Sequence, residues 1–356
     1  MKKEGLAHSI KFLVTFDEPT PAQYTACDSV GIKLYSFKQV IERGEATEGA
    51  EPFIKCTPSD CPLFSYTSGT TGDSKGVKLT HRNLLSSCIT VIPEMPNMAP
   101  GDAYISYLPF PHSFEQCLSF FAIMMGVKVG FYQGDPLKLT EDCGTLKPAL
   151  FPSVPRLYTR IYAKIKERLD GLTGCKGWLA QKATATKIHS LRTGPFYTDG
   201  CYDKLVFRKV ANLLGGDVKY MITASAPIDP NVLEFLKICF CCPMLEGYGL
   251  TETSGGSAFT WASDPVVGHV GGPVPCVKWR ILDVPEMQYF STDKPYPRGE
   301  LCMKGPAVFS GYYKIPQKTA EAFDSEGWFK TGDVVTIYPN GSVRIIDRSK
   351  NIFKLS

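Results

Sequence analysis

The sequence predicts an α/β fold followed by a β-rich part. Up to residue 265, short apolar runs that suit buried strands alternate with stretches in which apolar residues recur at helical spacing. From residue 266 onward the pattern changes to short strands separated by turn residues. We therefore expect an α/β domain over residues 1–265, a β-rich subdomain over residues 266–350 and a short stub over residues 351–356.

The first strands and helices have local signatures. Residues 10–14 and 31–35 are apolar runs of strand length, and residues 36–44 have the pattern of a helix that ends at a glycine. Two more strand-like runs, residues 63–66 and 77–79, flank a segment rich in glycine and hydroxyl side chains. This part of the chain therefore has an α/β rhythm.

Later helices are indicated by their first residues. Thr80 can cap a helix, Pro155 suits the first turn of another, and Asp229 stands before a proline that can begin a third. Residues 103–108 and 218–223 fit buried strands. The polar, glycine-containing residues 171–216 predict an excursion that carries further helices.

The β-rich part is expected to end in a hairpin. Strands are indicated at residues 277–282 and 300–304. Asn340-Gly341 is a strong signal for a two-residue turn between strands at residues 334–338 and 342–346. Such a hairpin would bring its two ends side by side.

Composition excludes few functions but removes some. The chain has 356 residues, of which 44% are hydrophobic, so it can bury a large core. Its net charge of +4 is mild and no basic run resembles a nucleic-acid-binding arm, so we expect no nucleic-acid partner. Weak peripheral attraction to an anionic membrane surface is permitted, but the apolar residues 117–132 are too short to span a bilayer.

Cysteine usage favours a reducing compartment. The 13 cysteines are scattered, and the only CxxC pattern runs from Cys239 to Cys242 within an apolar stretch. We expect reduced core cysteines rather than a zinc or redox site. The Lys-Leu-Ser ending does not match the peroxisomal tripeptide. A location in the cytoplasm, or on the cytosolic face of a membrane such as the endoplasmic reticulum, is therefore predicted.

The most informative segment is Thr67–Gly76. Its glycines allow backbone amides to converge on anionic oxygens, and its hydroxyls and lysine add donors, which is the composition of a triphosphate cradle. It is not a Walker A loop, because Ser74 stands where that pattern needs glycine and Gly76 follows Lys75. A flexible linker of similar composition would lack the flanking strands and the lysine.

Two other segments carry polar groups that could form a site. Gly247–Thr253 contains glycines but has Glu252 where a dinucleotide-binding pattern needs glycine, which disfavours a Rossmann fold. The predicted hairpin would bring Asp333 next to Arg348, an acceptor-only carboxylate beside a permanently charged donor. A surface salt bridge is the alternative explanation for that pair.

With its flanks, the Thr67–Gly76 segment resembles the phosphate loop of the adenylate-forming enzymes, which include acyl-CoA synthetases, luciferases and peptide-synthetase adenylation domains. The order of the motifs, the long segment between His112 and Tyr248, and residues 146–157 look most like long-chain fatty acid CoA ligases. The resemblance implies the large-domain fold of that superfamily, with stacked sheets flanked by helices, followed by the β-rich subdomain and without the mobile C-terminal domain.

The resemblance also implies residue roles. Tyr248 would stack on adenine, Thr251 would meet the α-phosphate, and His112 would lie beside the reacting carboxylate. Asp333 would accept hydrogen bonds from the ribose and Arg348 would help to hold ribose and phosphate. The implied catalytic residues are Thr67, Lys75, His112 and Glu252, of which Thr67 and Glu252 would hold magnesium. The implied nucleotide-binding residues are Thr67, Ser68, Gly69, Thr70, Thr71, Gly72, Lys75, Ser225, Ala226, Pro227, Glu246, Gly247, Tyr248, Gly249, Thr251, Asp333 and Arg348.

The implied reaction uses ATP, Mg²⁺ and coenzyme A as co-substrate. A long-chain fatty carboxylate would attack the α-phosphate to give acyl-adenylate and pyrophosphate, and coenzyme A thiolate would then displace AMP. Two positions depart from the family pattern: Ser74 stands where proline is usual, and Ala224-Ser225 stands where a glycine pair is usual.

Several alternatives remain open from the sequence. In the family a mobile domain with a further lysine follows a hinge, and Lys350 resembles the hinge residue, so a chain shortened at both ends is expected, either a gene-model fragment or a degenerate paralogue. Residual adenylation could survive in it, whereas full thioester formation is not expected. A non-catalytic nucleotide- or acyl-adenylate-binding module, a partner-binding pseudoenzyme, and an adenylating enzyme for an aryl or amino acid are the other hypotheses.

Overall fold

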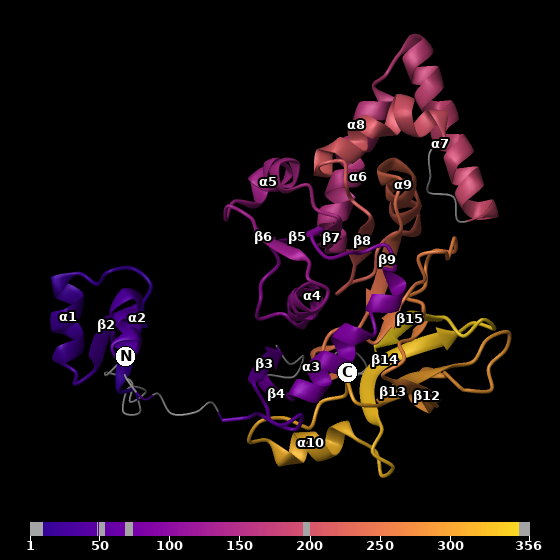
Figure 1. Ribbon diagram of the computed structural model, residues 1–356. Coiled ribbons are helices and arrows are strands. Elements are labelled where there is room, and N and C mark those ends of the chain that lie inside the picture. Colours follow the sequence, from indigo (N-terminus) through magenta and orange to yellow (C-terminus); the bar gives the residue numbers. More distant parts are fainter. Residues whose placement is uncertain (1–9, 48, 50–53, 68–73, 195–199, 349–356) are drawn as a thin grey trace. The chain divides into compact units, whose positions relative to one another are not determined.

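The computed structural model describes residues 10–47, 49, 54–67, 74–194 and 200–348. The chain divides into two compact units, Met1–Cys56 and Thr57–Ser356 (Figure 1). The predicted boundary at residue 265 does not coincide with this division and stays a prediction.

The first unit is a small parallel βαβα arrangement. Strands β1 (Phe12–Thr15) and β2 (Lys33–Ser36) pair in parallel, and helices α1 (Pro21–Asp28) and α2 (Phe37–Glu45) follow them. Both helices begin with a capping box, in which a hydroxyl side chain and a glutamine satisfy the free amides of the first turn. The predicted elements of this region are confirmed to within two residues.

The second unit is built on a seven-stranded sheet with the strand order β11-β10-β9-β8-β7-β5-β6. Strands β5 to β9 run parallel, and β10 and β11 join the sheet antiparallel at the edge opposite β6. The strands are β5 (Ala103–Ser106), β6 (Lys128–Phe131), β7 (Leu150–Ser153), β8 (Tyr220–Thr223), β9 (Met244–Tyr248), β10 (Ala258–Phe259) and β11 (Gly272–Pro273).

Helices cover both faces of this sheet, as expected for parallel strands joined by helical crossovers (Figure 1). Neighbouring residues of one strand enter different cores: Phe151 packs with Tyr158 of α6, whereas Leu150 packs with Phe121 of α4. The helices are α3 (His81–Ile89), α4 (Ser113–Met124), α5 (Leu139–Leu146), α6 (Pro155–Asp170), α7 (Gly174–Thr193), α8 (Arg208–Ala211), α9 (Pro230–Phe240) and α10 (Pro316–Ala322). A π-helical turn, η4 (Asp203–Phe207), precedes α8, and the 3₁₀ turn η6 (Thr251–Thr253) follows β9.

The predicted helix starts are confirmed. Thr80 caps α3 in a capping box, Pro155 stands in the first turn of α6, and the Asp229 carboxylate accepts from the first free amides of α9. The predicted excursion over residues 171–216 carries α7, the π-helical turn η4 and α8.

The β-rich part forms a four-stranded antiparallel sheet in the order β12-β13-β14-β15, and a separate hairpin pairs β3 with β4. The strands are β12 (Lys278–Leu282), β13 (Arg298–Lys304), β14 (Phe329–Ile337), β15 (Val343–Arg348), β3 (Leu63–Thr67) and β4 (Lys75–Leu79). The expected α/β fold with a β-rich part is therefore confirmed.

The turn between β14 and β15 differs from the two-residue turn that we expected. Ile337 pairs with Val343 and the Tyr338 amide donates to the Ser342 carbonyl at 2.9 Å, so the connection spans the three residues 339–341. Gly341 has a φ of 83°, whereas Asn340 is not among the residues with positive φ. A two-residue type I′ turn needs positive φ at both central positions, so the chain adopts the longer connection with glycine in the left-handed position.

Cysteine burial is more varied than expected. All 13 cysteines are free thiols, and seven are buried. Cys56, Cys61, Cys175 and Cys201 are exposed, so the expectation of core positions is wrong for these. Among the described residues no helix is long and apolar enough to cross a membrane.

A buried ion pair ties the excursion to the sheet-covering helix α9. Lys187 of α7, only 8% exposed, pairs with Asp203 of η4 and donates to the Ile238 carbonyl at 2.9 Å. We predict that Lys187→Ala lowers the free energy of unfolding by about 3–5 kcal/mol, because it leaves the Asp203 carboxylate buried without its partner.

Urea unfolding of the purified chain measures this loss. Lys166→Ala is the matched control, since Lys166 forms an exposed pair with Asp170 within one helix and its loss should cost about 0.5 kcal/mol or less. Equal effects of the two substitutions would contradict the assigned role of Lys187.

Candidate functional site

The phosphate-loop candidate is framed by the β3–β4 hairpin. Thr67, the last residue of β3, pairs directly with Lys75, the first residue of β4. The predicted loop residues Ser68, Gly69, Thr70, Thr71 and Gly72 lie outside the described residues. The strands thus hold one hydroxyl and one ammonium group at the same end of the hairpin.

Glu252 is brought to this hairpin by a segment of the β-rich part. The η6 turn that carries Glu252 lies next to β4. The Tyr312 hydroxyl donates to Glu252 Oε1 at 2.8 Å, and Lys75 Nζ lies 5.4 Å from the centre of the Tyr312 ring. Tyr312 was missed by the sequence analysis, because nothing in its local pattern indicated a contact with either residue.

A second cluster forms where β9 meets the β14–β15 hairpin. The Tyr248 hydroxyl donates to Asp333 Oδ2 at 2.7 Å, and Arg348 Nε lies 3.0 Å from Asp333 Oδ1. Asp333 is 3% exposed and is paired in register with Arg348, as the sequence predicted. Burial beside the Asp333 carboxylate raises the pKa of Tyr248, so its hydroxyl stays a donor.

These residues line a cavity of about 410 Å³ between the central sheet and the β14–β15 hairpin. Most of the predicted nucleotide-binding residues outside the phosphate loop belong to its lining, namely Ser225, Ala226, Pro227, Glu246, Gly247, Tyr248, Gly249, Asp333 and Arg348. Lining residues that the sequence analysis did not identify include His269, Arg344 and Asp347. Thr67, Lys75, Thr251 and Glu252 are outside this lining, although Thr251 and Glu252 directly follow the lining residue Leu250.

Two backbone positions explain the shape of the lining. Ser225 has a φ of 75°, the left-handed conformation that glycine adopts without cost, which accounts for the glycine usual at this point in the resembling family. A Cβ atom on Gly249 would lie 1.4 Å from the Gly255 carbonyl oxygen, so only glycine fits there.

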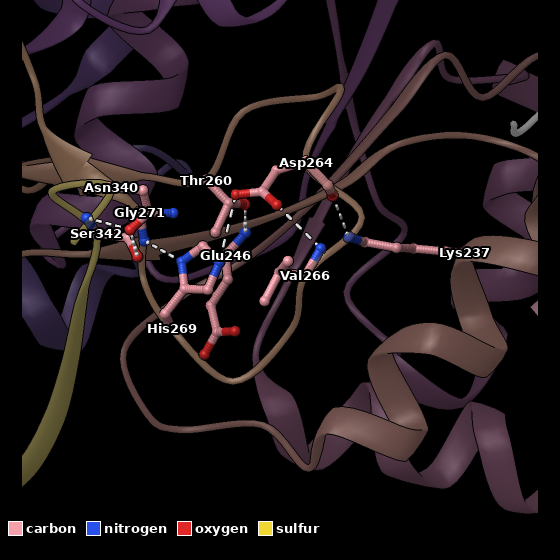
Figure 2. A network of polar contacts seen from close by, with 9 residues as sticks. All are labelled: Lys237, Glu246, Thr260, Asp264, Val266, His269, Gly271, Asn340 and Ser342. Carbon is pink, nitrogen blue, oxygen red and sulfur yellow. Dashed lines mark hydrogen bonds and ion pairs between the residues drawn. The ribbon is translucent and has the colours of Figure 1, made fainter. Parts of the chain in front are cut away.

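Glu246 lines this cavity and belongs to a buried polar network (Figure 2). Its amide donates to Thr260 Oγ1 at 2.9 Å, while its carboxylate oxygen Oε2 is buried without a hydrogen bond. Burial raises the pKa of Glu246 to about 7, although His269 and Lys237 oppose this shift.

The other members of the network hold His269 in place (Figure 2). His269 Nδ1 accepts from the Gly271 amide at 3.0 Å, which leaves the other ring nitrogen to face Asp264. His269 Nε2 lies 3.3 Å from Asp264 Oδ2, close enough for an electrostatic interaction but not aligned for a hydrogen bond. Lys237, 2% exposed, donates to the Asp264 carbonyl at 3.3 Å, and burial lowers the pKa of its ammonium group.

His112 lies at the start of α4, where its Nδ1 accepts from the Phe114 amide at 3.2 Å. Burial lowers the pKa of His112, which favours the neutral imidazole. With Cys117 and Phe259 it lines a crevice of about 30 Å³ that shares residues such as Ser225 and Tyr248 with the larger cavity. His112 therefore lies next to the larger cavity, and its predicted place beside a reacting carboxylate stays a prediction.

The residues near Glu252 suit a magnesium ion held mainly by a substrate. Among the described residues no group of three or more His, Cys, Asp or Glu side chains could form a metal site. The Glu252 carboxylate and the Thr67 hydroxyl offer the oxygen ligands that Mg²⁺ prefers, and this ion commonly takes only one or two protein ligands beside phosphates and water. When bound, the ion would neutralise phosphate charge.

Comparison with known proteins identifies the class. The profile described as "AMP-binding enzyme" matches residues 8–313, so the chain belongs to the AMP-binding enzyme family. Among curated relatives, it is 43% identical to "Long chain acyl-CoA synthetase 7, peroxisomal" of Arabidopsis thaliana over 92% of this chain and 46% of that protein. It is 39% identical to "Long-chain-fatty-acid--CoA ligase 1" of Homo sapiens over 99% of this chain and 50% of that protein. The chain thus spans about half the length of these relatives.

Solved structures agree with this class. The A-PCP didomain of carboxylic acid reductase from Segniliparus rugosus, solved in complex with AMP, superposes with a TM-score of 0.75 at 28% identity. The match covers 96% of this chain and 46% of that one. MatB from Rhodopseudomonas palustris, solved with bound ATP, superposes with a TM-score of 0.67 at 24% identity and supports the fold.

The Glu246 carboxylate predicts a pH dependence of stability. Its pKa is about 7 in the folded chain against an ordinary value of 4.5, so the folded state binds the extra proton between these values. The free energy of unfolding should therefore fall as pH rises through this window, by about 3 kcal/mol from this group.

Glu246→Gln removes the titration and tests this assignment. Relative to wild type, the variant should gain about 3 kcal/mol in unfolding free energy between pH 5 and pH 8, measured by urea unfolding. A difference between the two proteins that does not change with pH would contradict the raised pKa.

Proposed function

We propose that this chain binds Mg-ATP in the cavity around Asp333 and activates a long-chain fatty acid as its acyl-adenylate. The observation that carries the proposal is the convergence of three distant segments. The segments that approach one place are the β3–β4 hairpin with Thr67 and Lys75, the β9–η6 segment with Tyr248 and Glu252, and the end of the β14–β15 hairpin with Asp333. A cavity of about 410 Å³ lies beside them, a volume typical of small-molecule sites.

The cavity supplies the groups that an adenosine needs. The Tyr248 ring offers a stacking surface, and the buried Asp333 carboxylate is an acceptor for ribose hydroxyls. Ser225, Ala226 and Pro227 leave room for the base, and Glu246 also belongs to the lining, although its Oε2 is itself buried. Arg348 would extend from the ribose toward the α-phosphate.

The phosphates would lie toward the β3–β4 hairpin. A carboxylate and a phosphate oxygen about 4 Å apart repel by about 4 kcal/mol at an effective dielectric constant of about 20, so the site must supply positive charge. Lys75 supplies one charge, and Mg²⁺ bound through Glu252 and the Thr67 hydroxyl would supply more. We assign Thr251 and the loop residues Ser68–Gly72 to the phosphates on the resemblance to adenylate-forming enzymes.

The acyl carboxylate would lie near His112, at the junction of the cavity and the narrow crevice. Neutral His112 adds no negative charge where the acyl carboxylate and the phosphate, both anions, approach each other. Coenzyme A would be the co-substrate of the second step, in which its thiolate displaces AMP. Relatives named for long-chain fatty acids support the acyl class. We also propose that the chain acts in the cytosol or at the periphery of a membrane.

A nucleotide-binding function without catalysis is the second candidate. The cluster of Tyr248, Asp333 and Arg348 favours it to the same extent, because that cluster accounts for binding alone. Release of pyrophosphate from ATP when palmitate is added distinguishes the two functions. Saturable Mg-ATP binding with no pyrophosphate release would replace the catalytic proposal by the binding one.

Asp333→Asn should weaken ATP binding by about 10- to 100-fold, because a hydrogen bond to a charged group contributes about 1.5–3 kcal/mol. Isothermal titration calorimetry with Mg-ATP measures the loss. Asp283→Asn is the matched control, since Asp283 lies in the same β-rich part but outside the cavity lining. An Asp333→Asn variant that binds as tightly as the control would refute the assigned ribose site.

Chain-length preference gives a separate test of the acyl class. Non-hydrolysable acyl-adenylate analogues that carry longer chains should compete better with ATP, by up to about 0.8 kcal/mol for each buried methylene. Competition binding with analogues of two to sixteen carbons measures the trend. Equal competition at all lengths, or preference for an aryl analogue, would favour an adenylating enzyme for another carboxylic acid.

A further inference from the structure

The strand-like segment Phe309–Tyr313 connects the β-rich part to the β3–β4 hairpin. Lys78 donates its amide to the Gly311 carbonyl at 3.1 Å, and Tyr313 donates its amide to the Gly76 carbonyl at 2.8 Å. An antiparallel bridge between Val77 and Tyr312 lies between these two bonds. This segment therefore adds an edge to β4, directly behind Lys75.

The same segment also fixes the backbone of Glu252. The Phe309 amide donates to the Glu252 carbonyl at 2.8 Å, so the η6 turn is attached at its main chain. The Tyr312 hydroxyl then holds one carboxylate oxygen of Glu252, Oε1, also at 2.8 Å. Within the described residues the other oxygen, Oε2, makes no hydrogen bond, so the hydrogen bond at Oε1 sets the direction in which Oε2 points.

Tyr312 is itself firmly held. It is 8% exposed, its ring packs edge-on against Phe309 with centres 4.9 Å apart, and its amide donates to Thr319 Oγ1 at 2.9 Å. A buried aromatic side chain with a satisfied backbone has few rotamers available, so its hydroxyl is a fixed point. Lys75 Nζ, 5.4 Å from the ring centre, faces the same side chain as a cation over a π surface.

We propose that Tyr312 is a positioning residue that sets the geometry of Glu252 toward the magnesium ion of Mg-ATP and keeps Lys75 next to it. This inference rests on the proposed nucleotide site and adds a residue that no part of that proposal assigns. Tyr312 acts through Glu252 and Lys75 and does not itself touch the nucleotide. Its hydroxyl satisfies Oε1, so that Oε2 is the oxygen presented to the metal.

The test compares nucleotide binding with and without Mg²⁺. Tyr312→Phe removes only the hydroxyl and keeps the ring. We expect it to weaken binding of Mg-ATP about tenfold, since a hydrogen bond to a carboxylate is worth about 1.5–3 kcal/mol and only part of it acts through geometry. Binding of ATP in the presence of EDTA should change less than about twofold, and a higher Mg²⁺ concentration should restore the binding of Mg-ATP.

The neighbouring tyrosine provides the control. Tyr313 packs on Phe64 with ring centres 4.5 Å apart and is 39% exposed, and within the described residues its hydroxyl makes no hydrogen bond. Tyr313→Phe should leave both binding constants unchanged. A double-mutant cycle adds a second measurement: in a Glu252→Gln background, Tyr312→Phe should cause no further loss of Mg-ATP binding.

The outcomes separate the two proposals. Wild-type protein that fails to bind Mg-ATP overturns the proposed nucleotide site and this inference with it. Wild-type binding together with an unchanged Tyr312→Phe variant overturns this inference alone. Equal losses with and without Mg²⁺, or additive losses in the cycle, would mean that Tyr312 only supports the fold, which also overturns it.

Discussion

The Asp333 carboxylate joins two sheets whose residues lie far apart in the chain. One oxygen accepts from Tyr248 at the end of β9 and the other faces Arg348 at the end of β15, while the side chain is almost fully buried. A buried carboxylate needs such partners, because a charge that loses water and gains no hydrogen bond is strongly destabilising. The cavity between the sheets exists because this pairing fixes the hairpin against the edge where β9 ends.

The site's polar groups divide into two charge environments. Around Asp333, every carboxylate oxygen has a partner and the arginine side chain is half-exposed. Around Glu246, one oxygen is buried without a partner and three further titratable groups, Lys237, Asp264 and His269, lie nearby. Asp333 is paired on both oxygens, which suits the ribose-binding role that we propose for it. The Glu246 carboxyl group, whose pKa burial raises to about 7, changes its proton occupancy near neutral pH.

Local sequence signals predicted the helices and strands well. They also predicted which residues lie side by side in the β14–β15 hairpin. The helix caps at Thr80 and Asp229 and the register of Asp333 with Arg348 depend on short-range chemistry that a single sequence contains. Tyr312, Lys237 and His269 could not be found in this way. Tyr312 and Lys237 contact residues distant in the sequence, Glu252 and Asp264, whereas His269 contacts Asp264 and Gly271 close to it in the chain. Nothing in the local pattern of these three residues distinguishes them from core residues. The three-residue connection after Tyr338 was missed because the Asn-Gly signal does not specify the φ that asparagine adopts in the folded chain.

The two parts of the site differ in how much space they already contain. The nucleotide side has a cavity of about 410 Å³, whereas the crevice beside His112 has about 30 Å³, close to the space of one water molecule. The crevice wall includes Phe259, whose ring lies where a Cβ atom on Gly247 or Gly256 would be. The phenyl ring therefore already occupies the space beside those two glycines. For the proposed acyl chain to occupy this crevice, side chains such as Phe259 would have to change rotamer. Because cores are close-packed, that movement carries a cost that binding of an apolar chain must offset, so the acyl side should contribute selectivity and the preformed nucleotide side most of the affinity.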